Sequence, residues 1–462
     1  MPIIFPIETI NRELDSKLIL GGLLAKNGIK IYIGQHNFIN KIFRYLDKSF
    51  YIGKNMFRRK ADGNWISEYE NIKKFGHKII HLDEEGAVFW GSEEEWRRRL
   101  SHRMDVSRIS YEDSIYTWGQ FQKEYYHNST KSKNILVTGH PRFSFSIGNY
   151  SDIYKQETSF LKKKYGDFLL ITTSYQWSNN AFGIKDSFSK RVGYDSENTK
   201  SLIRHTKYWT HSAKMCAEFV KLTIELSTKI SSKKNIVLRP HPSEDLEIYM
   251  AAFRDIKNIY IDRSFSIMPW LLCCECLISE GCTTTIEAYL LNKKVCIYQP
   301  FKQMDMEMFL PSLMGKKCSD SEEVLDFISD NKNFSKPKLI KNKKALDLMI
   351  NLTNIDSFEL VKDCIMKQYK ESKFKLDDHT HNFSKSIILV AFKEHFLELI
   401  KDNIRKLFPK KNKLHKAYSS AFDSFDKENI NFKVRTIEKL IGKSLRVNYL
   451  GKKLLSIELN DD

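Results

Sequence analysis

Charged and hydroxyl side chains follow two strand-like, apolar runs in the middle of the chain. Residues 239–244 read R-P-H-P-S-E, and residues 279–288 read S-E-G-C-T-T-T-I-E-A. In the first segment the prolines fix φ and stiffen the turn, so we expect Arg239 and His241 to be held in place. An arginine beside a histidine that can donate a hydrogen bond suits the negative charge of a phosphate or diphosphate leaving group.

The second segment has the residue types of a phosphate-binding turn. Gly281 allows a tight turn, and hydroxyl residues lie where a helix is expected to begin. The N–H groups of a first helical turn have no partner inside the helix, and they attract anions. We therefore expect Ser279, Gly281, Thr283 and Thr284 to lie against a phosphate. An ordinary turn with a helix cap has the same composition, but two such segments on neighbouring strands support a ligand site.

A third candidate is the acidic turn D-E-E-G at 83–86, which follows another strand-like run. Carboxylates at a strand end, with a glycine that allows a sharp bend, can point into a cleft. Transfer of a group to a hydroxyl needs a general base or, in a double displacement, a carboxylate nucleophile. Asp83, Glu84 and Glu85 are the candidates. A solvated acidic turn is the alternative, because the chain nearby is also acidic.

The elements that would position these turns repeat along the chain. Strands are predicted at 3–7, 29–34, 78–82, 134–139, 168–173, 235–238, 259–261, 272–279 and 294–298, and helices at 14–26, 199–231 and 284–291. Alternating strands and helices predict α/β domains with parallel sheets covered by helices. Ligands of such sheets bind at the carboxyl ends of the strands.

The length of 462 residues favours two domains and an appendage. We expect Rossmann-like domains at 1–150 and 151–345, a return helix at 346–372, and a basic helical extension at 373–462. In the extension an apolar stripe is bordered by basic residues: Ile387, Ile388, Phe392, Phe396, Leu399, Ile400 and Leu407 beside Lys393, Lys401, Arg405, Lys406, Lys410 and Lys411. Such a segment either lies on an anionic membrane or packs on the core with a solvated lysine face.

The composition limits the partners. The formal net charge is +18, from 75 Lys and Arg against 57 Asp and Glu, which attracts polyanions. No nucleic-acid-binding motif is present, so we expect no nucleic-acid partner. The first residues lack the features of a signal peptide, and no run approaches a membrane span, which predicts a cytoplasmic protein. Cys273 and Cys276 form a C-x-x-C without a second pair, which predicts apolar packing rather than zinc.

The pairing of R-P-H-P with S-E-G-C-T-T-T-I-E-A resembles bacterial capsule and surface-polysaccharide glycosyltransferases of the GT-B fold. It looks closest to those that use CMP-activated ulosonic acids, which are 3-deoxy-D-manno-octulosonic acid (Kdo) or nonulosonic acids of the sialic, legionaminic and pseudaminic kind. The resemblance covers most of residues 1–345. It implies two domains facing across a cleft, with the N-terminal one acceptor-binding and catalytic. It also implies that Arg239 and His241 bind the nucleotide phosphate, and that Glu287 grips the ribose.

Two N-terminal segments resemble the same family. Glu8 and the R-E-L-D at 12–15 follow the first strand, and the G-H-P-R-F at 139–143 is similar to the family's G-N-P-R-F, with His140 in place of Asn. The resemblance implies that Glu8, Arg12, Glu13, His140 and Arg142 contact the donor or acceptor sugar. The D-E-E-G turn looks like the acidic-acidic-Gly turn of Kdo transferases, which implies Glu85 as the catalytic acid and Glu84 as the second choice.

The resemblance implies a glycosyltransferase that moves a sugar from a nucleotide donor to a capsule or lipopolysaccharide acceptor. Such an enzyme would work in the cytoplasm or at the inner face of the cytoplasmic membrane. We expect no cofactor or metal, since Arg239 and His241 can stabilise leaving CMP. Three alternatives stay open. A teichoic-acid-type polyol-phosphate transferase favours Asp where this chain has Glu280. A UDP-sugar 2-epimerase needs further carboxylates in the cleft, and a capsule-assembly protein would keep the fold without turnover.

Overall fold

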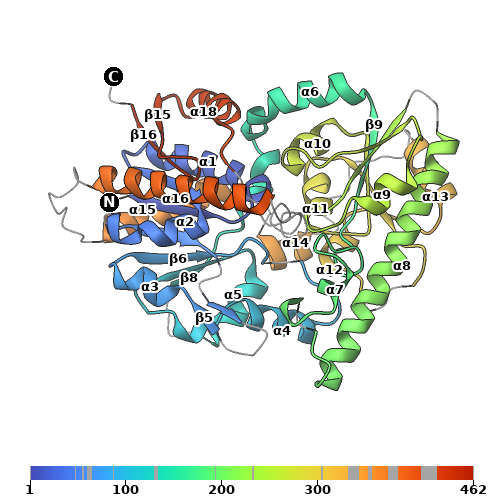
Figure 1. Cartoon of the computed structure of the whole chain (residues 1–462), viewed down its shortest axis with the longest axis horizontal. Coiled ribbons are helices and arrows are strands. Elements are labelled where there is room, and N and C mark those ends of the chain that lie inside the picture. Colours follow the sequence, from blue (N-terminus) through green and yellow to red (C-terminus); the bar gives the residue numbers. More distant parts are fainter. Residues whose placement is uncertain are drawn as a thin grey trace.

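The structure is a computed structural model. It describes residues 2–46, 48–54, 57–59, 65–86, 88–129, 134–192, 194–230, 234–302, 305–330, 343–351, 356–372, 383–406 and 424–460. The described chain forms two α/β domains side by side, each built on a mainly parallel sheet (Figure 1). This is the GT-B-like arrangement of two Rossmann-like domains that the sequence predicts. Leu407, Lys410 and Lys411 of the predicted basic stripe lie outside the described residues.

The first domain has its parallel strands in the order β2-β1-β3-β6-β7-β8. They are β1 (Ile3–Ile7), β2 (Ile31–Gln35), β3 (Phe50–Gly53), β6 (Lys78–Leu82), β7 (Ser114–Thr117) and β8 (Asn134–Val137). A small separate hairpin is formed by β4 (Phe57–Arg59) and β5 (Trp65–Ser67). The helices are α1 (Ile10–Ala25), α2 (His36–Ile42), α3 (Tyr69–Lys74), α4 (Glu93–Arg103) and α5 (Gln120–His127). Every residue of β1 is buried, because helices cover both faces of a parallel sheet. The strand order reverses direction at β1, between β2 and β3.

The second domain has six parallel strands in the order β11-β10-β9-β12-β13-β14. They are β9 (Phe168–Thr172), β10 (Asn235–Arg239), β11 (Ile259–Ile261), β12 (Cys276–Ser279), β13 (Lys294–Tyr298) and β14 (Lys316–Cys318). Its longer helices are α8 (Thr199–Lys229), α10 (Ile267–Cys273), α11 (Thr283–Leu290) and α13 (Ser321–Ser329). In chain order the sheet reads 3-2-1-4-5-6, the Rossmann order, with its switch point between β9 and β12.

Helix α6 (Lys155–Tyr165) leads into the second domain, and α14 (Lys343–Ile350) and α15 (Ser357–Glu371) return to the first. Leu346, Phe358 and Val361 of these helices are buried in the same apolar core as β1. None of the described helices is both long enough and apolar enough to cross a membrane.

The end of the chain differs in part from the prediction. The pattern after residue 373 predicts helices only, and α16 (Phe383–Lys406) and α18 (Lys427–Ile441) are present. The chain then ends in two strands, β15 (Leu445–Tyr449) and β16 (Leu454–Leu459), and β16 pairs antiparallel with β2. The helical prediction is wrong here, because these short apolar segments gain their β partners from the distant first domain.

The predicted strand at 272–279 is also shorter than expected. Its first residues belong to α10, which ends at Cys273, and β12 begins only at Cys276. Apolar content alone cannot separate the end of a buried helix from the start of a buried strand. Both cysteines are free thiols.

Candidate active site between the two domains

The carboxyl ends of β10, β9 and β12 lie side by side in the second domain. Thr172, the last residue of β9, is the register partner of both Arg239 on β10 and Ser279 on β12. Neighbouring strands are about 4.8 Å apart, so the R-P-H-P turn and the Ser/Thr turn flank the end of β9 directly. The structure therefore brings the two turns together at the switch point of the sheet, where sheets of this order bind ligands.

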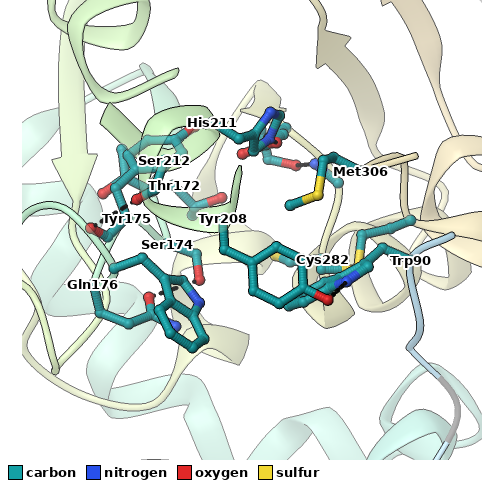
Figure 2. A pocket seen from close by; sticks show the side chains of 16 residues that line it. Trp90, Thr172, Ser174, Tyr175, Gln176, Tyr208, His211, Ser212, Cys282 and Met306 are labelled. Atoms are coloured by element: carbon teal, nitrogen blue, oxygen red, sulfur yellow. Dashed lines mark hydrogen bonds and ion pairs between the residues drawn. The ribbon is translucent and has the colours of Figure 1, made fainter. Parts of the chain in front are cut away.

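A pocket opens at this switch point and holds about 660 Å³ of space, part of it open solvent. Its walls come from the loop 172–177 after β9, the turn 279–282 after β12, and α8. Trp90 of the first domain closes one side, next to Tyr208, and Thr172 and Tyr175 lie at the other end (Figure 2).

The pocket is lined by aromatic rings and by hydrogen-bonding groups. Trp90 packs edge-on against Tyr208 at 5.2 Å between ring centroids, and its Nε1 donates to the Tyr208 hydroxyl at 3.2 Å. The hydroxyls of Thr172 and Tyr175 are buried and have no hydrogen-bond partner among the described residues. Buried hydroxyls without partners are costly, so these groups fit a polar ligand. Aromatic rings beside them suit a nucleobase or a sugar ring.

The R-P-H-P turn is held by a buried carboxylate. Glu244 accepts hydrogen bonds from the His241 backbone N–H at 2.8 Å, from Thr173 Oγ1 at 2.8 Å and from the Tyr249 hydroxyl at 2.6 Å. Three donors from three segments fix the turn, in addition to the two prolines. Glu244 thus positions His241, a role that the sequence motif alone does not reveal.

His241 is a neutral hydrogen-bond donor at physiological pH. Burial, assisted by the positive charges of Arg12 and Arg239, lowers its pKa to about 4. The backbone N–H of Ser243 donates to His241 Nδ1 at 3.2 Å, which places the ring proton on Nε2. The side chain therefore presents an Nε2–H group.

Arg239 remains charged and only partly engaged. Its Nη2 donates to the carbonyl of Phe265 at 2.8 Å, whereas its Nε is buried without a hydrogen-bond partner among the described residues. Burial lowers its pKa to about 10, which leaves the guanidinium protonated at neutral pH. A buried cation with an unused donor is a good receptor for an anionic group.

The hydroxyl residues of the Ser/Thr turn differ in their surroundings. Ser279 Oγ lies 2.8 Å from Thr285 Oγ1 and accepts from the Gly281 N–H at 3.1 Å, so both hydroxyls are consumed inside the turn. Ser279 is buried and also lines the pocket. Gly281 has φ +115°, a conformation that a side chain would strain. Thr283 is half-buried at the start of α11, and so is Thr284.

Glu287 uses one of its carboxylate oxygens in an ion pair, whereas its Oε2 is buried without a hydrogen-bond partner among the described residues. The residue is buried, and its Oε1 accepts from Arg142 Nε and Nη2, each at 3.0 Å. Arg142 belongs to the first domain, so this ion pair joins the two domains at the base of the cleft. The sequence assigns both residues to substrate contacts, whereas the structure pairs them with each other.

The three carboxylates of the acidic turn differ in burial and in their partners. Asp83 is buried and accepts from the Glu85 N–H at 3.1 Å and from Arg103 Nη1 at 3.3 Å. Glu84 is buried, 3.1 Å from Lys17 Nζ and 3.2 Å from His140 Nε2. Glu85 keeps 47% of its side chain exposed. The turn therefore presents Glu85, whereas its other two carboxylates are occupied in the interior.

Two arginines hold Glu85 in its ionised form. Arg12 Nη1 donates to Glu85 Oε1 at 2.6 Å, and Arg103 Nη2 donates to Oε2. Burial alone would raise the pKa of Glu85, but the charges of Arg103 and Arg12 lower it far below its usual range. The charge of Arg12 helps to lower the pKa of His241. Arg142 donates to the Glu84 carbonyl at 3.5 Å and to Glu287 on α11 at 3.0 Å, so the acidic turn lies close to the second domain.

Glu13 is the buried centre of a charged network that includes the other predicted residues Glu8 and Arg12, and the Glu8 side chain pairs with Lys54 at 3.0 Å. Glu13 is buried and binds Arg12 at 3.1 Å, Lys17 at 3.1 Å and Lys54 at 2.9 Å, and it also accepts from the Glu8 backbone N–H at 3.0 Å. Burial would raise the pKa of Glu13, but these cations lower it to about 2. Glu13 thus positions Arg12 rather than reaching a sugar itself.

His140 is likewise an interior residue. It is buried, its Nδ1 accepts from the Arg142 backbone N–H at 3.2 Å, and its Nε2 faces Glu84. Burial lowers the pKa of His140. His140 therefore lies against the acidic turn, and its contact with a sugar stays a prediction.

Several site residues are not found by the sequence motifs. Trp90, Tyr208 and His211 line the pocket, and His211 Nε2 lies 2.5 Å from Glu280 Oε1. One signal was available: the T-T-S at 172–174 follows a strand, as the two recognised turns do. A second was the presence of polar residues on the buried face of α8, such as His205 and Ser212.

No protein-family model matches the chain, and no curated protein matches it. Solved structures are similar at low identity. UDP-GlcNAc 2-epimerase from Methanocaldococcus jannaschii, in complex with UDP-GlcNAc and UDP, is 13% identical over 79% of this chain and 100% of its own, with a TM-score of 0.47. The wall teichoic acid polymerase TagF is 12% identical over 80% and 89%, with a TM-score of 0.44. UDP-GlcNAc 2-epimerase from Neisseria meningitidis is 11% identical over 80% and 100%, with a TM-score of 0.42. Scores of this size carry no argument about activity, which rests on the side chains.

Proposed function

We propose that this chain transfers a sugar from a nucleotide donor to a glycan acceptor. The observation that carries the proposal is the meeting of two unlike turns across the cleft: donors with spare capacity, Arg239 and His241, oppose one ionised and half-exposed carboxylate, Glu85. Donors that receive a leaving phosphate, facing a carboxylate that stabilises positive charge on a sugar ring, are what glycosyl transfer requires.

The nucleotide is proposed to bind in the second domain. Its base and ribose would occupy the pocket between Trp90, Tyr208 and the end of β9, where Thr172 and Tyr175 offer unused hydroxyls. Its phosphate would lie at the R-P-H-P turn and the N-terminus of α11. These groups supply a full positive charge and several N–H donors, so we propose that transfer requires no metal ion.

Glu85 is proposed to act at the anomeric carbon. A carboxylate with so low a pKa is a weak base, and this favours a role as a fixed negative charge or nucleophile over proton abstraction. As a nucleophile, its Oε atom would form a bond to the anomeric carbon while the bond from that carbon to the phosphate oxygen breaks. The acceptor oxygen would then displace Glu85 and lose its proton to water, with retention of configuration.

We further propose that the donor is a CMP-activated ulosonic acid, Kdo or a nonulosonic acid, and the acceptor a capsule or lipopolysaccharide glycan. A single donor phosphate needs no more charge than Arg239 provides. A ulosonic acid also carries a carboxylate, for which Arg12 at the cleft surface is a suitable partner, being 25% exposed.

The test is release of nucleotide by the purified full chain. CMP-Kdo, a CMP-nonulosonate, a CDP-polyol and UDP-GlcNAc would each be incubated with and without glycan acceptor. We expect acceptor-dependent CMP release from a CMP-sugar. Turnover of the CDP-polyol alone would establish polyol-phosphate transfer instead, and conversion of UDP-GlcNAc without release of UDP would establish epimerisation. Binding without any turnover would indicate an assembly protein.

A further inference from the structure

Helix α16 presents an apolar face to solvent. Its exposed large apolar side chains range from 36% exposure for Leu397 to 69% for Leu389 and Phe392. The full set is Ile388, Leu389, Phe392, Phe396, Leu397, Ile400 and Ile404. Exposed apolar side chains are ordinary when they are scattered, but a contiguous set on one element indicates an interaction surface.

The spacing makes these residues one continuous ridge. Ile388, Phe392, Phe396, Ile400 and Ile404 follow each other at intervals of four residues, and each step turns by about 40°, so they form a row that winds across the exposed half of the helix. At 1.5 Å per residue the ridge is about 24 Å long. We refer to these five residues, with Leu389 and Leu397, as the α16 ridge.

The opposite side of α16 anchors it to the first domain. Ile387 is buried in the core of that domain, Ala391 lies against Gly451 of the C-terminal hairpin, and Glu394 binds Lys41 at 2.6 Å. Figure 1 shows the helix lying flat across this domain, in front of α1 and α15. The ridge therefore points away from the protein on a supported helix.

The charge of the chain indicates which partner binds this surface. With a net charge of +18, two copies repel each other, whereas an anionic lipid surface attracts the protein. Lys393 is exposed on α16 itself, and Lys452 is exposed at the hairpin turn beside it. An exposed apolar ridge on a positively charged protein matches a helix that lies in the plane of an anionic bilayer.

We propose that the α16 ridge inserts into the headgroup and acyl-chain boundary of an anionic lipid bilayer. The helix lies parallel to the bilayer, at a depth of about 5–10 Å for its apolar side chains. It holds the first domain against the lipid surface, and the binding requires neither nucleotide nor acceptor.

Vesicle co-sedimentation of the full chain tests this proposal. Vesicles of phosphatidylcholine with phosphatidylglycerol are compared with vesicles of phosphatidylcholine alone. We expect the wild-type chain to bind the anionic vesicles, and to bind them less at high salt. The double variant Phe392→Glu/Phe396→Glu should lose about tenfold or more of this binding. The matched double variant Tyr111→Glu/Met250→Glu, at residues 69% and 60% exposed elsewhere, should bind like wild type.

Three results would overturn the proposal. The first is equal vesicle binding by wild type and the ridge variant, or none by wild type. The second is a dimeric wild type that the ridge variant converts to monomers in light scattering, which would assign the ridge to a second copy. The third is a melting temperature well below that of the matched control, which would show that the chain itself covers the ridge.

Discussion

The two domains meet at the cleft with strand ends that differ in how their charges are held. In the first domain the charged side chains form ion pairs, as Glu13 does with Lys17 and Lys54, although Arg12 Nε has no hydrogen-bond partner among the described residues. In the second domain the strand ends keep unused hydrogen-bonding groups, as at Arg239 and Tyr175. Paired buried charges are held rigidly, whereas unpaired donors remain costly until a ligand engages them. The first domain therefore has the features of a prepared reaction surface, and the second those of an anion receptor.

The largest expected effect comes from neutralising the single exposed carboxylate of the acidic turn. Glu85→Gln keeps the shape of the side chain but removes its negative charge, and turnover should fall about 10²- to 10³-fold. The protein should fold normally and bind nucleotide as before. Glu94→Gln, at an exposed acid on α4, is the control and should keep full turnover. If Glu85→Gln retains wild-type turnover, the reaction surface lies elsewhere.

The contact between the two domains is tested by Arg142→Ala. This change leaves Glu287 buried and without its partner, so the free energy of unfolding should fall by about 3 kcal/mol. Chemical denaturation measures the change. The exposed pair between Arg97 and Glu93 supplies the control, because Arg97→Ala should change the free energy by about 0.5 kcal/mol or less. Equal effects of the two substitutions would contradict an energetic link at the base of the cleft.

Acid should destabilise both domains through buried neutral histidines. Burial lowers the pKa of His81 in the first domain to about 4, as it does for His241 in the second. Below the usual histidine pKa the imidazole binds a proton in the unfolded chain but not in the native chain. The free energy of unfolding therefore falls as the pH drops from about 6.5 towards 4. At pH 5 each histidine accounts for roughly 2 kcal/mol.

Replacement of His81 isolates this contribution. In His81→Leu the difference in unfolding free energy between pH 7 and pH 5 should shrink by about 2 kcal/mol, because the titrating group is gone. Denaturant titrations at the two pH values give the difference. An unchanged difference would mean that this imidazole is protonated in the native state.

The smallest expected effect is the loss of one phosphate donor. His241→Ala should weaken binding of the donor nucleotide about tenfold, which corresponds to one hydrogen bond to a charged group. His241→Gln keeps an N–H donor at a similar distance and should restore part of the affinity. Calorimetric titration with CMP measures the affinity of both variants. Wild-type affinity of His241→Ala would show that His241 does not contribute to binding of the phosphate.

The fold was largely predictable because its strands are continuous apolar runs. The strand at Lys78–Leu82 has the predicted bounds, and so has the one at Lys294–Tyr298. The strand at Leu454–Leu459 was not foreseen, since its partner β2 lies more than 400 residues earlier in the chain. Local patterns report periodicity, but they do not report which distant strand offers an edge.

The sequence predicted which segments form the site, but it predicted the roles of individual side chains less well. The motifs identified the turns that meet, but not that Ser279 hydrogen-bonds Thr285 inside its own turn. They also could not show that Glu287 pairs with Arg142, which is 145 residues away. Residue type indicates what a side chain can do, whereas only packing decides whether it faces the ligand or the interior.

The most direct test of the receptor in the second domain compares CMP with cytidine by titration calorimetry. The difference in affinity isolates the phosphate, because the two ligands share base and ribose. We predict that CMP binds at least about tenfold more tightly than cytidine, and that the difference disappears in Arg239→Ala/His241→Ala. Equal affinities of wild type for CMP and cytidine, or a clear preference for UDP over CMP, would contradict the account.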